Sequence, residues 1–171
     1  MIQMHNPIVV LISADAEWSA VRNIMQGYSI HSSLYGEWLS HKYKGNPELT
    51  EPIIFMHGGW GKVSVAASIK FAIDNWHPNI NTNIGTCGGL EGEVSIGEII
   101  LANETIIYDI YKQLGDSSEA IKYYSTKIDN SWINMPFPIP ARQYLLISGD
   151  RDLFYKEIAE LKAGYGAIAV D

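Results

Sequence analysis

The sequence is poor in several features that mark particular classes of protein. It contains a single cysteine, Cys87, so no disulfide can form within the chain. It has 12 lysines and arginines against 19 acidic residues, a net charge of -7, whereas a surface that binds nucleic-acid phosphates needs clustered positive charge. No stretch has the apolar length of a membrane span or the layout of a signal peptide. These absences argue against nucleic-acid and membrane partners and favour a cytoplasmic location.

Motifs for metals and nucleotide cofactors are also missing. The five histidines are scattered, and none forms the H-x-x-x-H pair of a helical zinc site. The glycine-rich segment Gly58–Lys62 fails as a P-loop, because Met56 stands where the motif needs glycine and Val63 where it needs serine or threonine. The same segment matches the start of a dinucleotide fingerprint, but Ile84 and Gly85 occupy the place of its acidic partner. We therefore expect no metal and no cofactor.

The chain does have enough apolar residues to form a packed core. Of its 171 residues, 47% are hydrophobic and 18% are charged, which fits one globular domain. Pro7–Ser13 and Pro52–His57 are continuous apolar runs, as in strands that are buried on both faces. Each run is followed by a loop and by helical spacing, in the second case over Lys62–Trp76. Strand, loop and helix therefore occur twice in succession.

The segment Asn83–Ala102 places glycines around Thr86 and Cys87, between two apolar runs of which the second covers Ile96–Ala102. Glycine lets a backbone turn sharply and bring its N–H groups close to a ligand, and Thr86 adds a hydroxyl. The loop by itself fits a plain turn between strands slightly better than a binding loop. A nucleophilic Cys87 with His57 as its base needs an orienting group that spacing does not show, so Cys87 is interpreted as a small loop residue.

The remaining segments give weaker patterns. A hairpin around Gly36 is expected within residues 28–44, and a turn at Asn46–Pro47. Residues 112–134 are polar, and the prolines that follow them predict a loop. A strand over residues 143–148, an amphipathic helix over residues 153–163 with Phe154 on its inner face, and a last strand over residues 166–171 complete the prediction.

Together these elements predict an α/β fold, a three-layer α/β/α sandwich around a mixed, mostly parallel central sheet. In such a sheet the loops after parallel strands lie at one edge, where ligands bind. That edge should gather Glu17, Gly58–Lys62, Gly85–Gly89 and Ser148–Asp152. Glu17 also has a simpler interpretation, as an acid that complements the dipole of its helix. Since an apolar strand seldom ends a domain, we expect residues 1–171 to be one domain truncated at its C-terminus.

The order of these segments resembles the nucleoside phosphorylase/nucleosidase superfamily, and within it the 5'-methylthioadenosine/S-adenosylhomocysteine nucleosidases. The resemblance spans the whole chain, and its most specific part is G-T-C-G-G-L followed by V-S-I-G-E-I-I. The matching segments are S-A-D-A-E-W (13–18), G-W-G-K-V (59–63), N-I-G-T-C-G-G-L (83–90), V-S-I-G-E-I-I (94–100), I-S-G-D (147–150) and A-I-A-V-D (167–171).

The resemblance implies one catalytic residue and a sugar-binding loop. Glu17 falls where similar nucleosidases keep the carboxylate that activates the attacking water. Thr86, Cys87 and Gly88 fall where an S-A-G segment lines the ribose and the base. Asp171 falls just before the ribose-binding glutamate of the family, which lies outside this sequence together with the acid that protonates the base. By this comparison the chain alone should be a poor catalyst.

Three further residues depart from the family pattern. Asp152 and Leu153 fall near the base-stacking positions, where the family often has an aromatic residue that Phe154 would replace. Trp60 stands where a smaller aliphatic side chain often contacts the 5'-substituent, so its indole would reshape that pocket.

The function implied by the resemblance is hydrolysis of the N-glycosidic bond of a purine nucleoside such as 5'-methylthioadenosine or S-adenosylhomocysteine, in methionine salvage. A phosphate-dependent phosphorylase is the first alternative, but Asp15 and Asn83 occupy places where related phosphorylases resemble G-D-P-x-R or carry arginine. A nucleoside-binding homologue without turnover is the second. The helix carrying Val65 and Trp76 is apolar on more than one side, which predicts a homodimer, as is usual in similar enzymes.

Overall fold

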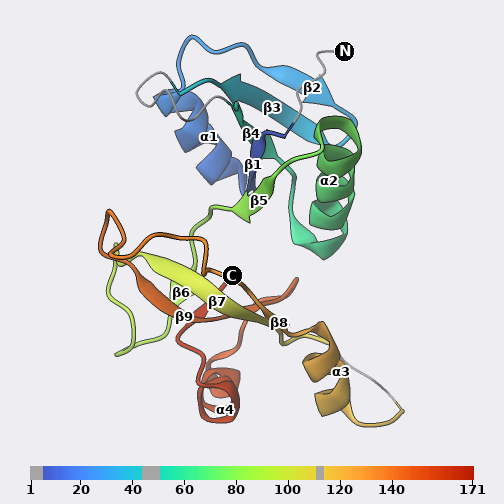
Figure 1. The fold of residues 1–171 in the computed structure, drawn as a ribbon. Helices are drawn as coiled ribbons and strands as arrows, with labels where there is room; N and C mark the ends of the chain where they lie inside the picture. Colours follow the sequence, from blue (N-terminus) through green and yellow to red (C-terminus); the bar gives the residue numbers. More distant parts are fainter. Residues whose placement is uncertain (1–5, 44–50, 111–113) are drawn as a thin grey trace. The chain divides into compact units, whose positions relative to one another are not determined.

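A five-stranded mixed sheet with a helix on each face forms the first half of the chain. The computed structural model describes residues 6–43, 51–110 and 114–171, and it divides into two compact units, Met1–Thr86 and Cys87–Asp171. The sheet of the first unit has the order β2-β3-β4-β1-β5 (Figure 1). Its strands are β1 (Ile8–Ile12), β2 (His31–Ser33), β3 (Gly36–His41), β4 (Ile53–His57) and β5 (Ile80–Asn83), and its helices are α1 (Asp15–Ile24) and α2 (Gly61–Trp76).

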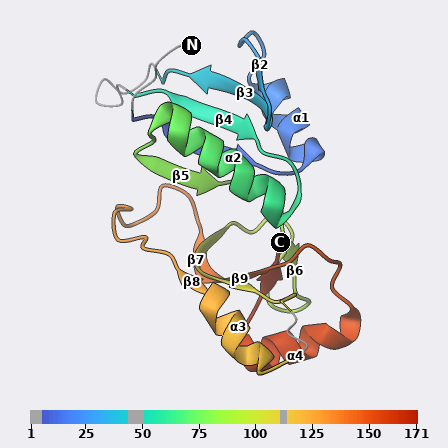
Figure 2. The same ribbon diagram turned by 90° about the vertical axis from the view of Figure 1, so that its right-hand side faces the viewer.

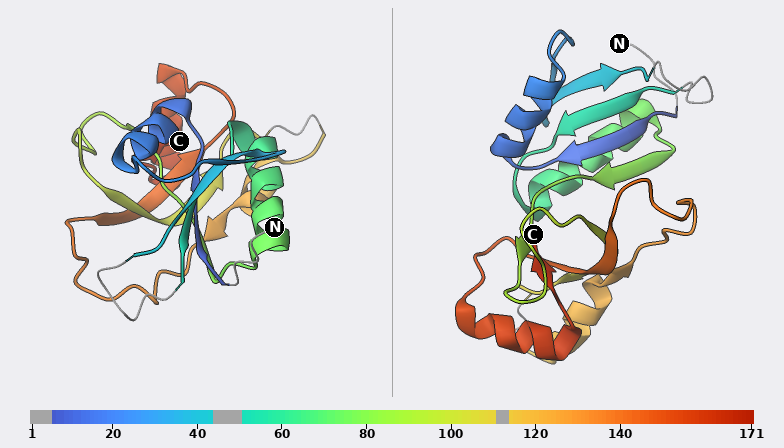
Figure 3. Two further views of the ribbon diagram at one scale, coloured as in Figure 1. Left: turned by 90° about the horizontal axis from the view of Figure 1, so that it is seen from above. Right: turned by 90° about the vertical axis from the view of Figure 1, so that its left-hand side faces the viewer.

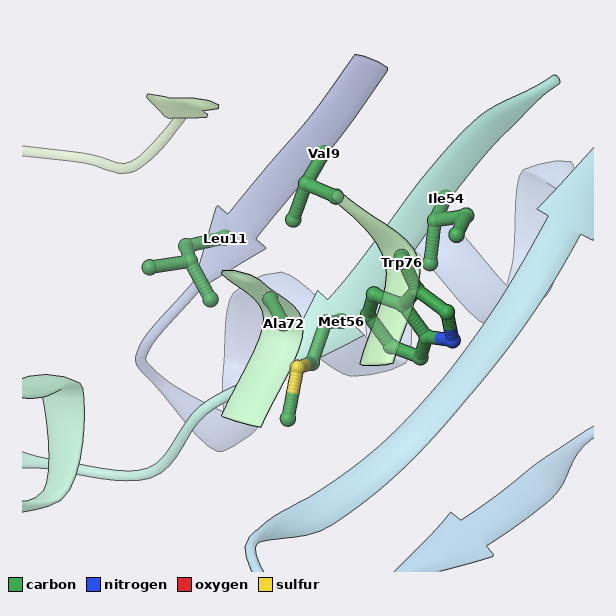
Figure 4. Close-up of a cluster of buried hydrophobic side chains, with 6 residues drawn as sticks. All are labelled: Val9, Leu11, Ile54, Met56, Ala72 and Trp76. Atoms are coloured by element: carbon green, nitrogen blue, oxygen red, sulfur yellow. The ribbon is translucent and has the colours of Figure 1, made fainter. Parts of the chain in front are cut away.

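Strand β1 lies between β4 and the edge strand β5 and is buried on both sides. It pairs in parallel with β4 and with β5, and its side chains alternate between two hydrophobic clusters. Val9 and Leu11 belong to one cluster with Ala72 and Trp76 of α2 (Figure 4). Val10 and Ile12 pack with Trp18 of α1 on the opposite face. Burial of each such side chain contributes roughly 1.5–3 kcal/mol, so this strand organises the unit.

Figure 3 shows α1 and α2 on opposite sides of the sheet of the first unit. The three-layer arrangement that the apolar runs predicted is therefore confirmed there. The hairpin is confirmed as well, because β2 and β3 pair antiparallel and Ser33 lies opposite Gly36. Gly36 has a φ of 134°, and a Cβ at this position would collide with the backbone carbonyl of His57. Asn46 and Pro47 lie outside the described residues.

The second unit contains another five-stranded mixed sheet, with the order β6-β10-β9-β7-β8. Its helices α3 and α4 both contribute to one hydrophobic cluster with Ile106 and Ile147. Figure 2 shows the two helices beside this sheet. The strands β7, β9 and β10 are parallel, and the short β6 and β8 pair antiparallel at the edges. The bounds are β6 (Gly88–Gly89), β7 (Ile100–Ile107), α3 (Ser117–Tyr124), β8 (Thr126–Lys127), β9 (Arg142–Ser148), α4 (Tyr155–Tyr165) and β10 (Ala169–Val170).

Three expectations for the second half are wrong in detail. The strand expected from Ile96 begins only at Ile100, because Gly97 adopts a φ of 83° in a turn that precedes it. Residues 117–124 form a helix within the polar stretch 112–134, where the sequence predicted none. Phe154 is not on the inner face of α4 but precedes the helix as its N-cap, with 64% of its surface exposed.

Among the helices of the described residues, none has both the length and the hydropathy that crossing a membrane requires.

Candidate active site

The loops that follow β1, β4 and β5 lie at one edge of the first unit. Parallel pairing puts the carboxyl ends of these strands side by side, and two backbone hydrogen bonds extend the pairing beyond them. The amide of Gly58 donates to the carbonyl of Ile12 at 3.0 Å, and the amide of Ile84 donates to that of Leu11 at 3.0 Å. This edge is where open α/β sheets bind their ligands.

Glu17 and Thr86 meet at this edge, although 69 positions separate them in the sequence. The backbone amide of Thr86 donates to Glu17 Oε1 at 2.5 Å, and the Thr86 hydroxyl donates to the same oxygen at 2.8 Å. Gly85 leaves the room for this contact, since a Cβ there would lie 3.2 Å from Glu17 Oε1. The structure therefore brings together two residues that the sequence assigned to one site.

The other carboxylate oxygen of Glu17 is held by its own helix. Glu17 is the third residue of α1, and the amide of Ala14, the N-cap, donates to Glu17 Oε2 at 3.2 Å. This is the return bond of a capping box, which stabilises the start of a helix. An ionised carboxylate offers about four acceptor directions, of which these three donors use three. One direction remains with which the half-buried Glu17 can accept a hydrogen bond from a water molecule.

Trp60 lies in the loop after β4, as the N-cap of α2, and 72% of its surface is exposed. The loop itself is fixed by Ser68, a fully buried side chain of α2. Its hydroxyl donates to the carbonyl of Gly58 at 2.8 Å and contacts the carbonyl of Ser64 at 2.9 Å. The indole therefore projects from a well-held loop.

His57 is a residue of this edge that the sequence did not assign to the site. Its Nε2 lies 3.2 Å from the carbonyl oxygen of Ser13 and 3.3 Å from a carboxylate oxygen of Asp15. The alternation of β4 is the signal that could have shown it, because Ile54 and Met56 face α2 and the next residue must face α1.

In the second unit, the residues of the candidate site lie at the carboxyl ends of β7, β9 and β10. The amide of Gly149 donates to the carbonyl of Asp171 at 3.2 Å, and the amide of Asp150 donates to a carboxylate oxygen of Asp109 at 2.8 Å. Gly88 pairs with Val170, which puts the start of β6 at the same edge. Thus Gly88, Asp150 and Asp171 gather at one edge of this sheet.

Cys87 precedes β6 and is the one cysteine of the chain. Partial burial raises the pKa of its thiol, and the nearby carboxylate of Asp171 raises this pKa further. A raised pKa keeps the thiol protonated at neutral pH, so Cys87 is a poor nucleophile.

The two residues expected near the base have different environments. Asp152 is exposed, whereas Leu153 is half-buried and packs against the hydrophobic cluster of the second unit. Arg151 beside them is held by Glu157 through contacts of 2.7 and 3.0 Å. Among the residues that the structure describes, no three His, Cys, Asp or Glu side chains gather in a way that would hold a metal ion.

Comparison with known proteins gives a consistent result. No model of a known protein family matches the chain. The chain is 23% identical over 103 residues to 5'-methylthioadenosine/S-adenosylhomocysteine nucleosidase from Bacillus subtilis. These matched residues make up 60% of this chain and 42% of that protein. The matched stretch thus spans less than half the length of that relative.

Solved structures of low sequence identity share the fold. One of them is a D198N mutant of the Helicobacter pylori nucleosidase with 5'-methylthioadenosine in its active site. The match covers 97% of this chain and 74% of the mutant's chain, with a TM-score of 0.76 and 17% sequence identity. A futalosine hydrolase mutant from Helicobacter pylori matches 97% and 78% of the two chains, with a TM-score of 0.76 and 16% identity. The resemblance seen in the sequence is confirmed: relatives and structural neighbours of this chain include 5'-methylthioadenosine/S-adenosylhomocysteine nucleosidases, and the chain has their α/β fold.

Proposed function

We propose that this chain hydrolyses the N-glycosidic bond of a purine nucleoside such as 5'-methylthioadenosine or S-adenosylhomocysteine, releasing adenine and the thioribose. The observation that supports this best is the Glu17 carboxylate at the carboxyl edge of β1, oriented by Thr86 and Ala14. A curated relative of the chain is named a nucleosidase for these two substrates.

In the proposed reaction, the bond from C1' to the purine nitrogen breaks and the sugar develops positive charge at C1'. Water forms the new bond to C1' and gives one proton to Glu17, and the departing adenine takes up one proton from solvent. A positioned general base of this kind contributes roughly 10²–10⁴-fold to a rate. The three donors on Glu17 keep its two oxygens in place, so the free acceptor direction is fixed as well. Thr86 therefore serves the reaction by orienting the base, in addition to lining the sugar.

The other site residues are assigned to the substrate. We propose that Cys87 and Gly88 line the ribose and the base, together with Asp171. Asp152 and Leu153 are placed beside the base, and Trp60 beside the 5'-substituent. The exposed indole of Trp60 gives that substituent a flat apolar contact.

Water is a better nucleophile than phosphate at this edge. Asp15 exposes 85% of its side chain two residues before Glu17, and such a carboxylate repels a phosphate dianion. Arg22, the basic residue of the last turn of α1, is paired with Glu37 at 3.6 Å. We therefore propose that turnover needs no phosphate.

The test is adenine release from 5'-methylthioadenosine under single-turnover conditions, with the chain in excess so that slow chemistry is detected. We expect release without phosphate and a loss of about 10²–10⁴-fold in Glu17→Gln. Asp74→Asn, which alters an exposed pair with Lys70 on α2, is the matched control and should keep the wild-type rate.

Three results would contradict the proposal. Strict dependence on phosphate would identify a phosphorylase. Binding of the nucleoside without release of adenine would identify a binding protein. Turnover of futalosine but not of 5'-methylthioadenosine would place the chain with the other structural neighbour.

We also propose that the protein is a cytoplasmic homodimer that acts in methionine salvage. The residues first expected at the interface do not support this, because Trp76 is buried in the first unit and Val65 packs against the same cluster. The exposed large apolar side chains of α2 are Val63 and Ile73, at 83% and 43%. Val63→Glu should therefore shift the mass in sedimentation equilibrium from dimer to monomer, and a wild-type monomer would refute the dimer.

A further inference from the structure

His57 is the last residue of β4. Its side chain contacts Trp18 of α1 and the turn Ser13–Asp15, at which α1 begins. Because Ile54 and Met56 pack on the α2 side of the sheet, His57 faces the other side. Its ring stacks on the buried indole of Trp18 with the centroids 5.7 Å apart and the planes 7° apart. Only 17% of its side chain is exposed.

The hydrogen bonds of the ring define where its proton lies. Nε2 contacts the carbonyl oxygen of Ser13 at 3.2 Å and the Asp15 carboxylate at 3.3 Å. A carbonyl oxygen and an ionised carboxylate only accept hydrogen bonds, so Nε2 must carry a proton in this arrangement. His57 is thus a donor directed at the turn.

The turn held in this way is the one that places Glu17. Ser13 and Ala14 join β1 to α1, and the amide of Ala14 donates to Glu17 Oε2. A shift of this turn would move the first turn of α1, and with it the carboxylate that meets Thr86. The stack on Trp18 fixes the ring from the helix side, and Trp18 is in turn held by a 2.9 Å hydrogen bond from its indole to Glu37.

We propose that His57 is a positioning residue, which keeps Glu17 in its place against Thr86 by donating from Nε2 to the Ser13–Asp15 turn. The proposal deepens the hydrolase function above and rests on it for its kinetic consequence. His57 itself touches no reacting atom in this scheme. It acts by limiting the movement of the base, and misplacement of a catalytic group by about 1 Å can cost 10²-fold in rate.

The test compares two substitutions at His57. His57→Leu removes the donor and keeps an apolar contact for Trp18, whereas His57→Gln restores an N–H donor near the position of Nε2. We expect His57→Leu to lower the single-turnover rate of adenine release tenfold or more, with less than a threefold change in the half-saturating nucleoside concentration. His57→Gln should recover most of that rate. His41→Leu, which removes another histidine of the same sheet, is the matched control.

Hydrogen exchange of single amides provides a readout that needs no activity. The amides of Ala14 and Thr86 both donate to Glu17, so both should exchange at least tenfold faster in His57→Leu and return toward wild type in His57→Gln. If the wild type released no adenine, the proposed hydrolysis would fail while these exchange rates still tested the positioning.

Several outcomes would overturn the inference. These are a His57→Leu rate equal to that of His41→Leu, a His57→Gln rate no better than that of His57→Leu, and unchanged exchange at Ala14 and Thr86. Should His57→Leu not fold, Asp15→Ala removes one acceptor at a side chain that is 85% exposed. The substitution Asp15→Ala should then accelerate hydrogen exchange of the Ala14 amide, and an unchanged exchange rate would count against the proposal.

Discussion

Gly85 shows how a single missing side chain supports the candidate base. Its Cα faces the Glu17 carboxylate, and a Cβ would lie 3.2 Å from Oε1 and 3.4 Å from Oε2. These distances are tight, so a methyl group there would displace the carboxylate by a few tenths of an ångström. The identity of this residue therefore bears on the position of the proposed base.

We accordingly expect Gly85→Ala to lower the rate of adenine release by about tenfold, because even a small shift of a general base weakens proton transfer. The measurement is the single-turnover assay at saturating nucleoside. Gly164→Ala is the matched control, since a Cβ there meets nothing within 4 Å, and it should leave the rate unchanged. An unimpaired Gly85→Ala would mean that the position of Glu17 is not critical.

For single residues, the sequence predicted which side chains belong to the site better than it predicted the contacts between them. Glu17 and Thr86 were both assigned to the site, but spacing does not reveal that the threonine donates twice to the carboxylate. The contacts of His57 were not predicted, because its partners are a backbone carbonyl and a carboxylate 42 positions away. Only the pairing of β1 with β4 brings them together.

Among the elements, α4 begins with a strongly bound acid. Arg151 donates two hydrogen bonds to Glu157 and the Phe154 amide donates another, which together lower the pKa of Glu157 from 4.5 to about 2. The fold therefore favours the ionised form. The resulting stabilisation is complete above about pH 4.5, the pKa in an unfolded chain, and it is lost as the pH falls toward 2.

From this we predict that Glu157→Gln melts at a lower temperature than the wild type at pH 7. The difference should shrink as the pH falls from about 4.5 toward about 2, because the wild-type carboxylate then becomes protonated too. Thermal melts followed by circular dichroism at several pH values would measure it. Glu160→Gln on the same helix is the control, and a difference that persists undiminished to pH 2 would contradict the prediction.

The end of α2 contains a conformational strain that a substitution can relieve. His77 is the C-cap of the helix and has a φ of 47° and a ψ of 57°, in the left-handed region. This region costs a residue with a Cβ about 1–2 kcal/mol, whereas glycine adopts it freely. The stability that a glycine would gain here by relieving the strain is reduced by the larger conformational entropy that glycine loses on folding, roughly 0.5–1 kcal/mol.

His77→Gly should consequently raise the free energy of unfolding by about 0.5–1 kcal/mol in urea titration. His77→Ala separates the two possible causes, because it removes the imidazole but keeps the Cβ. If both variants gained equally, the loss of the side chain and not the backbone conformation would be responsible.

The elements that the sequence predicted well have a strong apolar pattern. The strands around Val10 and Ile54 are continuous apolar runs and lie where expected. The helix α3 was missed because its sequence is polar; its start is stabilised instead by Asp116, whose side chain accepts a 2.8 Å hydrogen bond from the Ser118 amide. A cap of this kind leaves little trace in hydrophobic periodicity.

The whole molecule has separate hydrophobic cores in its two units. Ile54 and Ile147 are fully buried, one in each unit. Apolar patterning predicted both as strand residues, but it does not tell which strands share a sheet, so two sheets were not foreseen. Pairing depends on contacts between segments far apart in the chain.

Truncation of either isoleucine to alanine should cost about 2–5 kcal/mol. Since the cores are separate, we expect Ile54→Ala to accelerate amide exchange chiefly within residues 6–86, and Ile147→Ala within residues 87–171. Exchange followed by mass spectrometry would map both. Uniform acceleration over the whole chain in each variant would show that the two units unfold together.

The burial of β1 on both faces has a consequence for synthesis. This I-V-V-L-I segment leaves the ribosome before its neighbours β4 and β5, which begin only at Ile53 and Ile80. At roughly 5–20 residues per second, the nascent chain carries this uncovered segment for several seconds. Short, uncharged β-formers of this kind are prone to aggregate, so yield in a cell should depend on chaperones that bind this segment as it emerges.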